Sequence, residues 1–262
     1  MSSEIEKLCK SLSKKEYYND EWKTARSFEN YEEIEIEYSF GKRKCLKKKS
    51  QDLYEATQSS RGMIAIKDYD DIEPILEQVD LEELFGSDLL RIEEIDEFIR
   101  KGMIKLPKNA KLAELGFRVP KLIKYYQENH GIAGKGFDVV RVNVLVGKKL
   151  GYNVEEYDFS ESDKNLDLEQ ANLVISYHML EHITDPLKAI KRVFDSMDPG
   201  SYFHVEIPVE PDGPRLRYAH LFPFHPHDLG HMLIEAGFKV LFGTNKVHEG
   251  GPWIERYLAY KE

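Results

Sequence analysis

The 262-residue sequence has few cysteines, no long apolar run and no excess of positive charge, and each shortage excludes a class of protein. Its two cysteines, Cys9 and Cys45, exclude a framework of several disulfides and a four-cysteine zinc site. No apolar run approaches the roughly 18 to 20 residues that a membrane-spanning helix needs. The first residues also lack the basic-then-apolar pattern of a secretion signal. We therefore expect a cytoplasmic protein with no membrane partner.

The formal net charge of -10 disfavours a polyanionic partner. Nucleic-acid binding needs clustered Lys and Arg to neutralise phosphates. Two short basic runs do exist, at 42–44 and 47–49, but no aromatic residue interleaves them as a stacking platform would require. We interpret both runs as part of a solvated hairpin turn and expect no nucleic-acid partner.

Residues 1–105 carry no recognisable motif and are predicted to form an N-terminal α+β appendage. Apolar residues alternate with polar ones from Ile34 to Phe40, which predicts a half-buried strand that enters a turn at Gly41. Residues 68–97 hold thirteen acids and one base, Arg91, with apolar residues at helical spacing, and predict acidic surface helices. The appendage could serve as a lid, a substrate element or a homodimer interface, and its residues do not choose among these roles.

From residue 106 onward, short strands alternate with amphipathic helices, the pattern of a doubly wound, Rossmann-like parallel sheet. Asp185-Pro186 opens one helix, whose apolar residues fall on one face before Pro199-Gly200 ends it. The other predicted helices are 120–128, 143–150 and 226–236, and the seven predicted strands are 110–116, 136–140, 154–159, 173–177, 202–207, 238–242 and 253–260.

The segment from Asn172 to Pro186 carries the most informative motif. An apolar strand runs into His178-Met-Leu-Glu181-His182 and then into a helix start. This segment resembles the fourth strand and following loop of class I S-adenosylmethionine (SAM) dependent methyltransferases. The resemblance covers about residues 108 to 262, within a predicted methyltransferase domain at 106–262, and implies a seven-stranded sheet closed by an antiparallel hairpin.

The resemblance also implies a cofactor site beyond the carboxyl ends of the strands, where ligands of open α/β sheets bind. The family pattern of acid, x, Gly, x, Gly, x, Gly matches Glu114-Leu-Gly116-Phe-Arg118-Val-Pro120. Arg118 and Pro120 replace two glycines, which narrows the space near the methionine moiety and removes one N–H. Arg118 could instead bind the cofactor carboxylate.

Two aspartates at strand ends complete the implied cofactor site. Asp138 lies 22 residues after Gly116 and would accept from the ribose hydroxyls. Asp158 and Phe159 resemble the acid-aromatic pair that contacts adenine, and Tyr177 ends the next strand. Each acid alone could equally be a helix cap or a surface charge. The glycines between 131 and 136 run into a strand, so we interpret them as a connection and not as a phosphate-binding loop.

The His178–His182 motif also matches the His-x-x-Glu-His signature of inverted zinc peptidases. That class needs both histidines on one continuous helix, whereas here a strand precedes them and Asp185-Pro186 starts a new helix. Some methyltransferases of the resembled family, including small-RNA 2′-hydroxyl and quinone-precursor enzymes, bind a divalent metal through Glu-x-x-Glu-His and a later residue. The equivalent ligands here are His178, Glu181, His182 and His225, with His220 as the alternative to His225.

Two imidazoles or more with one carboxylate suit zinc or another borderline metal. Without a metal, His178, His182 or His220 is the candidate general base. No Asn-Pro-Pro-Tyr-like motif follows residue 177, and the polar stretch from Glu206 to Arg217 suits a saccharide or another hydroxylated small molecule. The sequence therefore predicts SAM-dependent O-methylation. The alternative is a non-catalytic methyltransferase-like scaffold in which the altered glycine loop no longer binds SAM.

Overall fold

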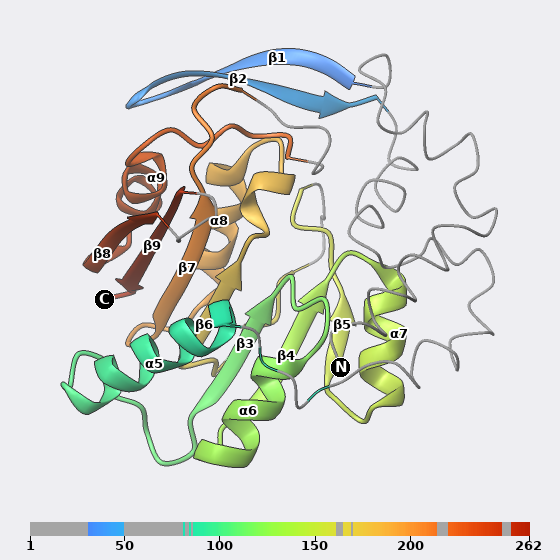
Figure 1. Cartoon of the computed structure of the whole chain (residues 1–262), viewed down its shortest axis with the longest axis vertical. Coiled ribbons are helices and arrows are strands. Elements are labelled where there is room, and N and C mark those ends of the chain that lie inside the picture. Colours follow the sequence, from blue (N-terminus) through green and yellow to red (C-terminus); the bar gives the residue numbers. More distant parts are fainter. Residues whose placement is uncertain are drawn as a thin grey trace.

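A computed structural model describes residues 31–49, 81, 84, 86–160, 165–168, 170–213, 220–247 and 253–262. It contains a seven-stranded sheet flanked by helices and a separate two-stranded hairpin (Figure 1). The helical spacing expected between residues 68 and 80 lies outside the described residues. Among the described residues, no helix is long and apolar enough to cross a membrane.

The sheet has the strand order β5-β4-β3-β6-β7-β9-β8. Strand β9 runs antiparallel to both of its neighbours and the remaining pairs are parallel. This confirms the predicted Rossmann-like fold. The direction of winding reverses between β3 and β6, which makes their carboxyl ends the topological switch point. The strands are β3 (Lys111–Leu115), β4 (Ala133–Asp138), β5 (Val154–Glu156), β6 (Leu173–Tyr177), β7 (Tyr202–Pro208), β8 (Lys239–Val247) and β9 (Trp253–Tyr260).

Helices cover both faces of this sheet (Figure 1). On one face lie α5 (Gly86–Arg100), α6 (Lys121–His130) and α7 (Arg141–Lys149). On the other lie α8 (Pro186–Ser196) and α9 (Asp228–Ala236). Helix α5 precedes the predicted boundary at residue 105, yet its Ile92, Ile95 and Phe98 are buried against the sheet. Helix α5 is therefore a surface helix, as expected, on one face only, because its other face is buried.

Gly131 caps the end of α6 and belongs to the predicted connection, whereas Gly134 and Gly136 already lie in β4, which begins at Ala133. Gly136 lets the sheet approach its covering helix closely. A Cβ at this position would lie 2.7 Å from Phe117 Cδ1 and 3.0 Å from Ile123 Cδ1, both shorter than a normal contact. Glycine is therefore needed in this strand because a side chain at this position would push the covering helix away from the sheet.

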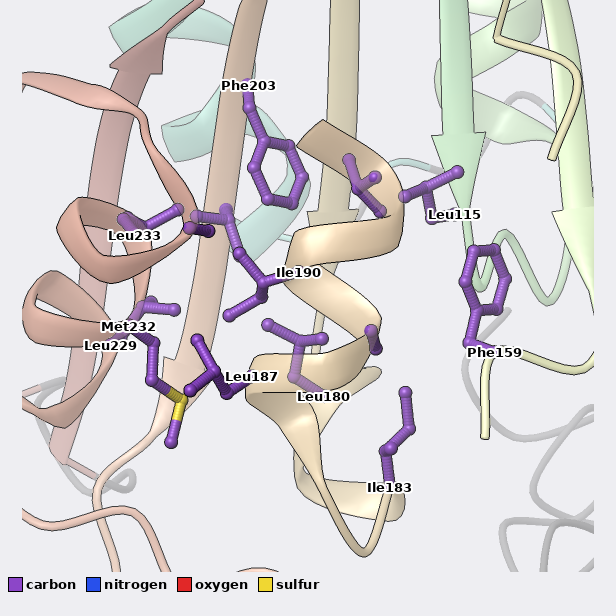
Figure 2. Packing of buried hydrophobic residues seen from close by; sticks show 14 of the residues in the cluster. Leu115, Phe159, Leu180, Ile183, Leu187, Ile190, Phe203, Leu229, Met232 and Leu233 are labelled. Carbon is purple, nitrogen blue, oxygen red and sulfur yellow. The ribbon is translucent and has the colours of Figure 1, made fainter. Parts of the chain in front are cut away.

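The loop after β6 is anchored in the larger core cluster. Leu180 and Ile183 are each 1% exposed and lie close to Leu187 of α8 (Figure 2). Between them, η3 (Leu180–His182) places Glu181 and His182 in the interior. Because the apolar residues on either side of this pair are packed, the two polar side chains are held in one place.

The N-terminal hairpin, β1 (Tyr31–Tyr38) and β2 (Gly41–Lys48), lies across the end of the molecule where β7 and α8 meet the loops (Figure 1). Its main chain bridges two of these loops: Leu46 N donates to Leu221 O at 2.9 Å, and Thr184 Oγ1 donates to Leu46 O at 2.9 Å. The predicted hairpin is present, but residues 42–44 belong to β2 and not to its turn: Lys42 and Lys44 are exposed, whereas Arg43 forms an ion pair with the buried Asp228.

We expect Arg43→Met to destabilise the protein by about 3 kcal/mol, because it leaves the carboxylate of Asp228 buried without its cation. Asp228 is 1% exposed, and Arg43 Nε donates to its Oδ2 at 2.7 Å. Urea denaturation measures the change. The matched control is Lys42→Met, which removes an ion pair to Glu35 whose side chains are 57% and 47% exposed. Exposed pairs contribute about 0.5 kcal/mol, so equal effects of the two substitutions would contradict the assignment.

Candidate active site

The end of β3 supplies the first group of predicted cofactor residues. Glu114 is 7% exposed, and its Oε2 has no hydrogen-bond partner among the described residues. Burial, reinforced by the negative charge of Asp88, raises the pKa of this carboxyl well above its usual value. A cation placed beside Glu114 would reverse that shift, since an opposite charge favours the ionised form.

The altered glycine loop keeps its left-handed backbone despite the substitutions. Gly116 has φ of 74° and Arg118 has φ of 50°. A Cβ on Gly116 would lie 2.8 Å from Met179 Cγ, so glycine is needed at that position. The side chain of Arg118 is exposed and does not plug the interior. Its main-chain N–H donates to Asp138 Oδ2 at 2.9 Å, which ties the loop to the end of β4.

Asp138 organises the end of β4. Its carboxylate accepts from Arg118 N, from Val140 N at 2.8 Å and from Asn143 Nδ2 at 3.0 Å. Burial raises the pKa of Asp138, and these donors oppose the rise. An ionised carboxylate offers about four acceptor positions. The described residues use three of them, which leaves room for a further donor.

The residues predicted to contact adenine follow the neighbouring strand β5. Asp158 is half-buried and accepts from Ser160 N at 2.7 Å. Phe159 is 3% exposed, and its ring packs against Tyr157 with centroids 4.8 Å apart, so it lies in the core (Figure 2). Because β4 and β5 are paired, the two predicted aspartates stand at adjacent strand ends.

A buried ionic network that the sequence analysis missed lies beneath α5. Glu206, at the end of β7, accepts from the guanidinium groups of Arg91 on α5 and Arg256 on β9. Arg256 also donates to Glu94 of α5 at 2.9 Å. Burial opposes ionisation of Glu206, but the surrounding cations lower its pKa below the usual range. Arg91, the single base among the acids of 68–97, was the feature of the sequence that could have indicated this network.

Tyr177, predicted to bind the cofactor, belongs to the same network. Its hydroxyl lies 2.7 Å from His204 Nδ1, and the Arg91 guanidinium stands 4.6 Å from the centre of its ring. The other nitrogen of His204 lies 3.2 Å from Glu94 Oε2. Tyr177 thus connects β6 to α5 through polar contacts.

His178 lies between two carboxylates. Its Nε2 is 2.9 Å from Glu206 Oε1 and its Nδ1 is 3.3 Å from Glu181 Oε1. Its backbone adopts φ of 54°, which is uncommon for a residue with a side chain. Burial disfavours the charged ring, but the two carboxylates outweigh it and raise the pKa of His178 to about 9. Near neutral pH the ring is therefore a cation and a hydrogen-bond donor, which disfavours its use as a general base.

The predicted metal residues come together only in part. Ligand atoms of Glu181, His182 and His220 all lie within 4.8 Å of one another, and all three residues are buried. His225 is not in this group; its main-chain N donates instead to Asp228 Oδ2. His220 takes the predicted place of His225, because the chain after it bonds to the η3 loop through Leu221 N and Glu181 O at 2.8 Å.

The ligand atoms of Glu181, His182 and His220 are close enough together to bind a metal ion or to share a proton. Oε1 of Glu181 lies 3.9 Å from Nε2 of both His182 and His220. That separation exceeds a hydrogen bond and is also wider than the roughly 3.4 Å between two donors of a tetrahedral zinc, whose bonds are each about 2.0 to 2.1 Å, so the side chains would have to close slightly around an ion. Neither oxygen of Glu181 has a partner of hydrogen-bond geometry among the described residues. Burial would raise the pKa of Glu181, yet the surrounding histidines hold it at about 2.

Comparison with known proteins adds a family match. A family model described as a methyltransferase domain matches residues 90–241, more than half of the chain. No curated protein matches the sequence. Several solved structures resemble this chain at 11 to 14% sequence identity, and at that level the resemblance shows a shared fold.

A candidate sarcosine dimethylglycine methyltransferase from Galdieria sulphuraria is 14% identical, with a TM-score of 0.56 over 79% of this chain and 98% of that one. The cyclase SpnF is 13% identical, with a TM-score of 0.52 over 74% and 93%. Phosphoethanolamine N-methyltransferase 2 of Haemonchus contortus, solved with SAM, is 11% identical, with a TM-score of 0.51 over 64% and 52%.

Proposed function

This chain belongs to the methyltransferase-domain family, among the class I SAM-dependent methyltransferases, and on that premise we propose that it methylates an oxygen atom of a sugar or another hydroxylated small molecule. The observation that carries the proposal is the buried group of Glu181, His182 and His220 at the carboxyl edge of the sheet. A hydroxyl acceptor must lose its proton during methyl transfer, and imidazoles beside a carboxylate are suited to take it. A neutral amine already carries a nucleophilic lone pair, so an amine acceptor needs such a group only when it arrives protonated.

The residues at the ends of β3 and β4 fit SAM. The cofactor carries an ammonium and a sulfonium, and Glu114 presents a buried carboxylate oxygen with no partner of its own in the described chain. The unused acceptor position of Asp138 suits a ribose hydroxyl. When bound, SAM supplies a methyl group on a positively charged sulfur. Glu114, Gly116, Asp138 and Asp158 would hold it, with the Arg118 main chain closing the loop.

We assign different roles to the three histidines because the groups around them differ. His178, held as a cation by Glu206 and Glu181, would donate to the acceptor or orient it. His182 or His220 would accept the proton of the hydroxyl through an unprotonated ring nitrogen. The walls of the interior, closed by the packed hairpin, would exclude water from the reacting pair.

The same three residues would hold a divalent metal, zinc or another borderline ion, by the chemistry of their donor set. A metal in this place lowers the pKa of a bound hydroxyl. The metal and the free imidazole are two forms of one proposal, since each activates a hydroxyl acceptor with the same side chains. The metal content of the purified protein distinguishes these two forms.

Glu181→Gln should abolish stoichiometric metal binding, because it removes the only carboxylate of the group. Elemental analysis after purification without chelators or a His-tag, followed by calorimetric titration with zinc, measures the effect. The control is Glu128→Gln, whose side chain is 57% exposed on α6. A wild-type protein without metal, whose activity survives EDTA, would leave the imidazoles alone as the base.

Calorimetric titration with SAM and with its demethylated product tests the function. Binding near micromolar affinity, together with transfer of a labelled methyl group to sugars or phenols but not to amines, is the expected result. Transfer only to amines would remove the oxygen acceptor. No binding by properly folded protein would support the scaffold alternative.

A further inference from the structure

We infer that Glu210 is a positioning residue that fixes the orientation and the tautomer of His220. Both side chains are buried, at 4% exposure each, and Glu210 Oε2 lies 2.7 Å from His220 Nδ1. The other ring nitrogen, Nε2, is 3.9 Å from Glu181 Oε1. The two residues stand ten positions apart, at the two ends of the stretch 211–219.

The backbone around both residues is tied to the site. Glu210 lies two residues beyond the end of β7, and its main-chain N donates to Phe224 O at 2.7 Å. Leu221 N and Phe222 N, directly after His220, both donate to Glu181 O, at 2.8 and 3.1 Å. The main chain therefore places Glu210 on one side of the imidazole and Glu181 on the other.

The charge on Glu210 then decides which nitrogen carries the proton. A carboxylate accepts a hydrogen bond and cannot donate one, so Nδ1 of a neutral His220 must carry the hydrogen. In this tautomer the lone pair is on Nε2, which lies 3.9 Å from Glu181 Oε1. That lone pair is what either a metal ion or an acceptor proton requires. The inference rests on the proposed function only for the use made of this lone pair.

The first test is independent of cofactor, acceptor and metal. Nitrogen-15 NMR of the full chain, labelled at histidine, reports which ring nitrogen is protonated, and His220→Gln identifies the signals. At a pH where the ring is neutral we expect the Nδ1–H tautomer in the wild type. We expect a mixture of tautomers in Glu210→Ala. An Nε2–H tautomer in the wild type, or an unchanged tautomer in Glu210→Ala, would overturn the inference.

The second test uses zinc alone as the probe. Removing the carboxylate that orients a metal-binding histidine weakens metal affinity by about 10- to 100-fold, and we expect this loss for Glu210→Ala. Glu210→Gln keeps an acceptor oxygen and should lose less, which provides a second variant if alanine prevents folding. The matched control is Asp212→Asn, exposed two positions later. Equal zinc affinity for folded wild type and Glu210→Ala would count against positioning, whereas a wild type without zinc affinity leaves the decision to the tautomer measurement.

Discussion

Glu206→Gln should lower the free energy of unfolding by about 3 to 5 kcal/mol, the usual cost of removing one partner from a buried ion pair. Glu206 is 1% exposed and neutralises Arg91 of α5, Arg256 of β9 and the His178 cation in the loop after β6. A neutral amide would leave surplus positive charge in the interior. Urea denaturation near pH 7 measures the change, and a loss below 1 kcal/mol would show that the network is solvated.

The control for this substitution is Glu97→Gln on α5, which removes an ion pair with Lys101 whose side chains are 45% and 58% exposed. We expect a change of about 0.5 kcal/mol or less. Both variants keep the volume of the side chain. A difference between them therefore reports burial of the charge and not a change of size.

The effect of Glu206→Gln should depend on pH in a defined direction. The folded pKa of Glu206 is lowered from 4.5, so its contribution is present above pH 4.5 and is lost as the pH falls through the folded pKa. The difference in unfolding free energy between wild type and variant should be constant from pH 6 to 7 and should shrink below pH 4.5. A difference that grows on acidification would contradict ionisation of Glu206 in the folded protein.

Asp138→Ala should weaken SAM binding by about 100-fold, or roughly 2.7 kcal/mol. The substitution removes the proposed ribose acceptor and also leaves the N–H groups of Arg118 and Val140 without their carboxylate. Calorimetric titration measures the affinity, and circular dichroism checks that the variant is folded. The second effect predicts that the variant is also less stable.

A matched control for Asp138→Ala is Glu156→Ala, which removes an exposed carboxylate from the adjacent strand β5. It should bind SAM with the affinity of the wild type. A folded Asp138→Ala variant that binds within threefold of the wild type would place the ribose elsewhere. In that case Asp138 would serve only to tie the loop after β3 to β4.

Much of the methyltransferase domain could be predicted from the sequence because its signals are local. The strand over 173–177 has the predicted bounds, since a largely apolar run ends there at a polar loop. Helix α8 begins at the predicted Pro186, where Asp185 caps Lys188 N at 3.3 Å. Alternation, capping and helix-breaking residues act over a few positions, so one sequence suffices to place them.

The tertiary structure decided which polar groups meet. Arg91 lies 115 positions from Glu206, and their pairing depends on where α5 docks on the sheet. His220 and not His225 joins Glu181 because main-chain bonds from Leu221 and Phe222 align that part of the chain with η3. The sequence alone determined the strands, the helices and the kinds of chemical group at their ends. The contacts among those groups came from long-range packing, in which charge and shape must match across elements that no local pattern relates.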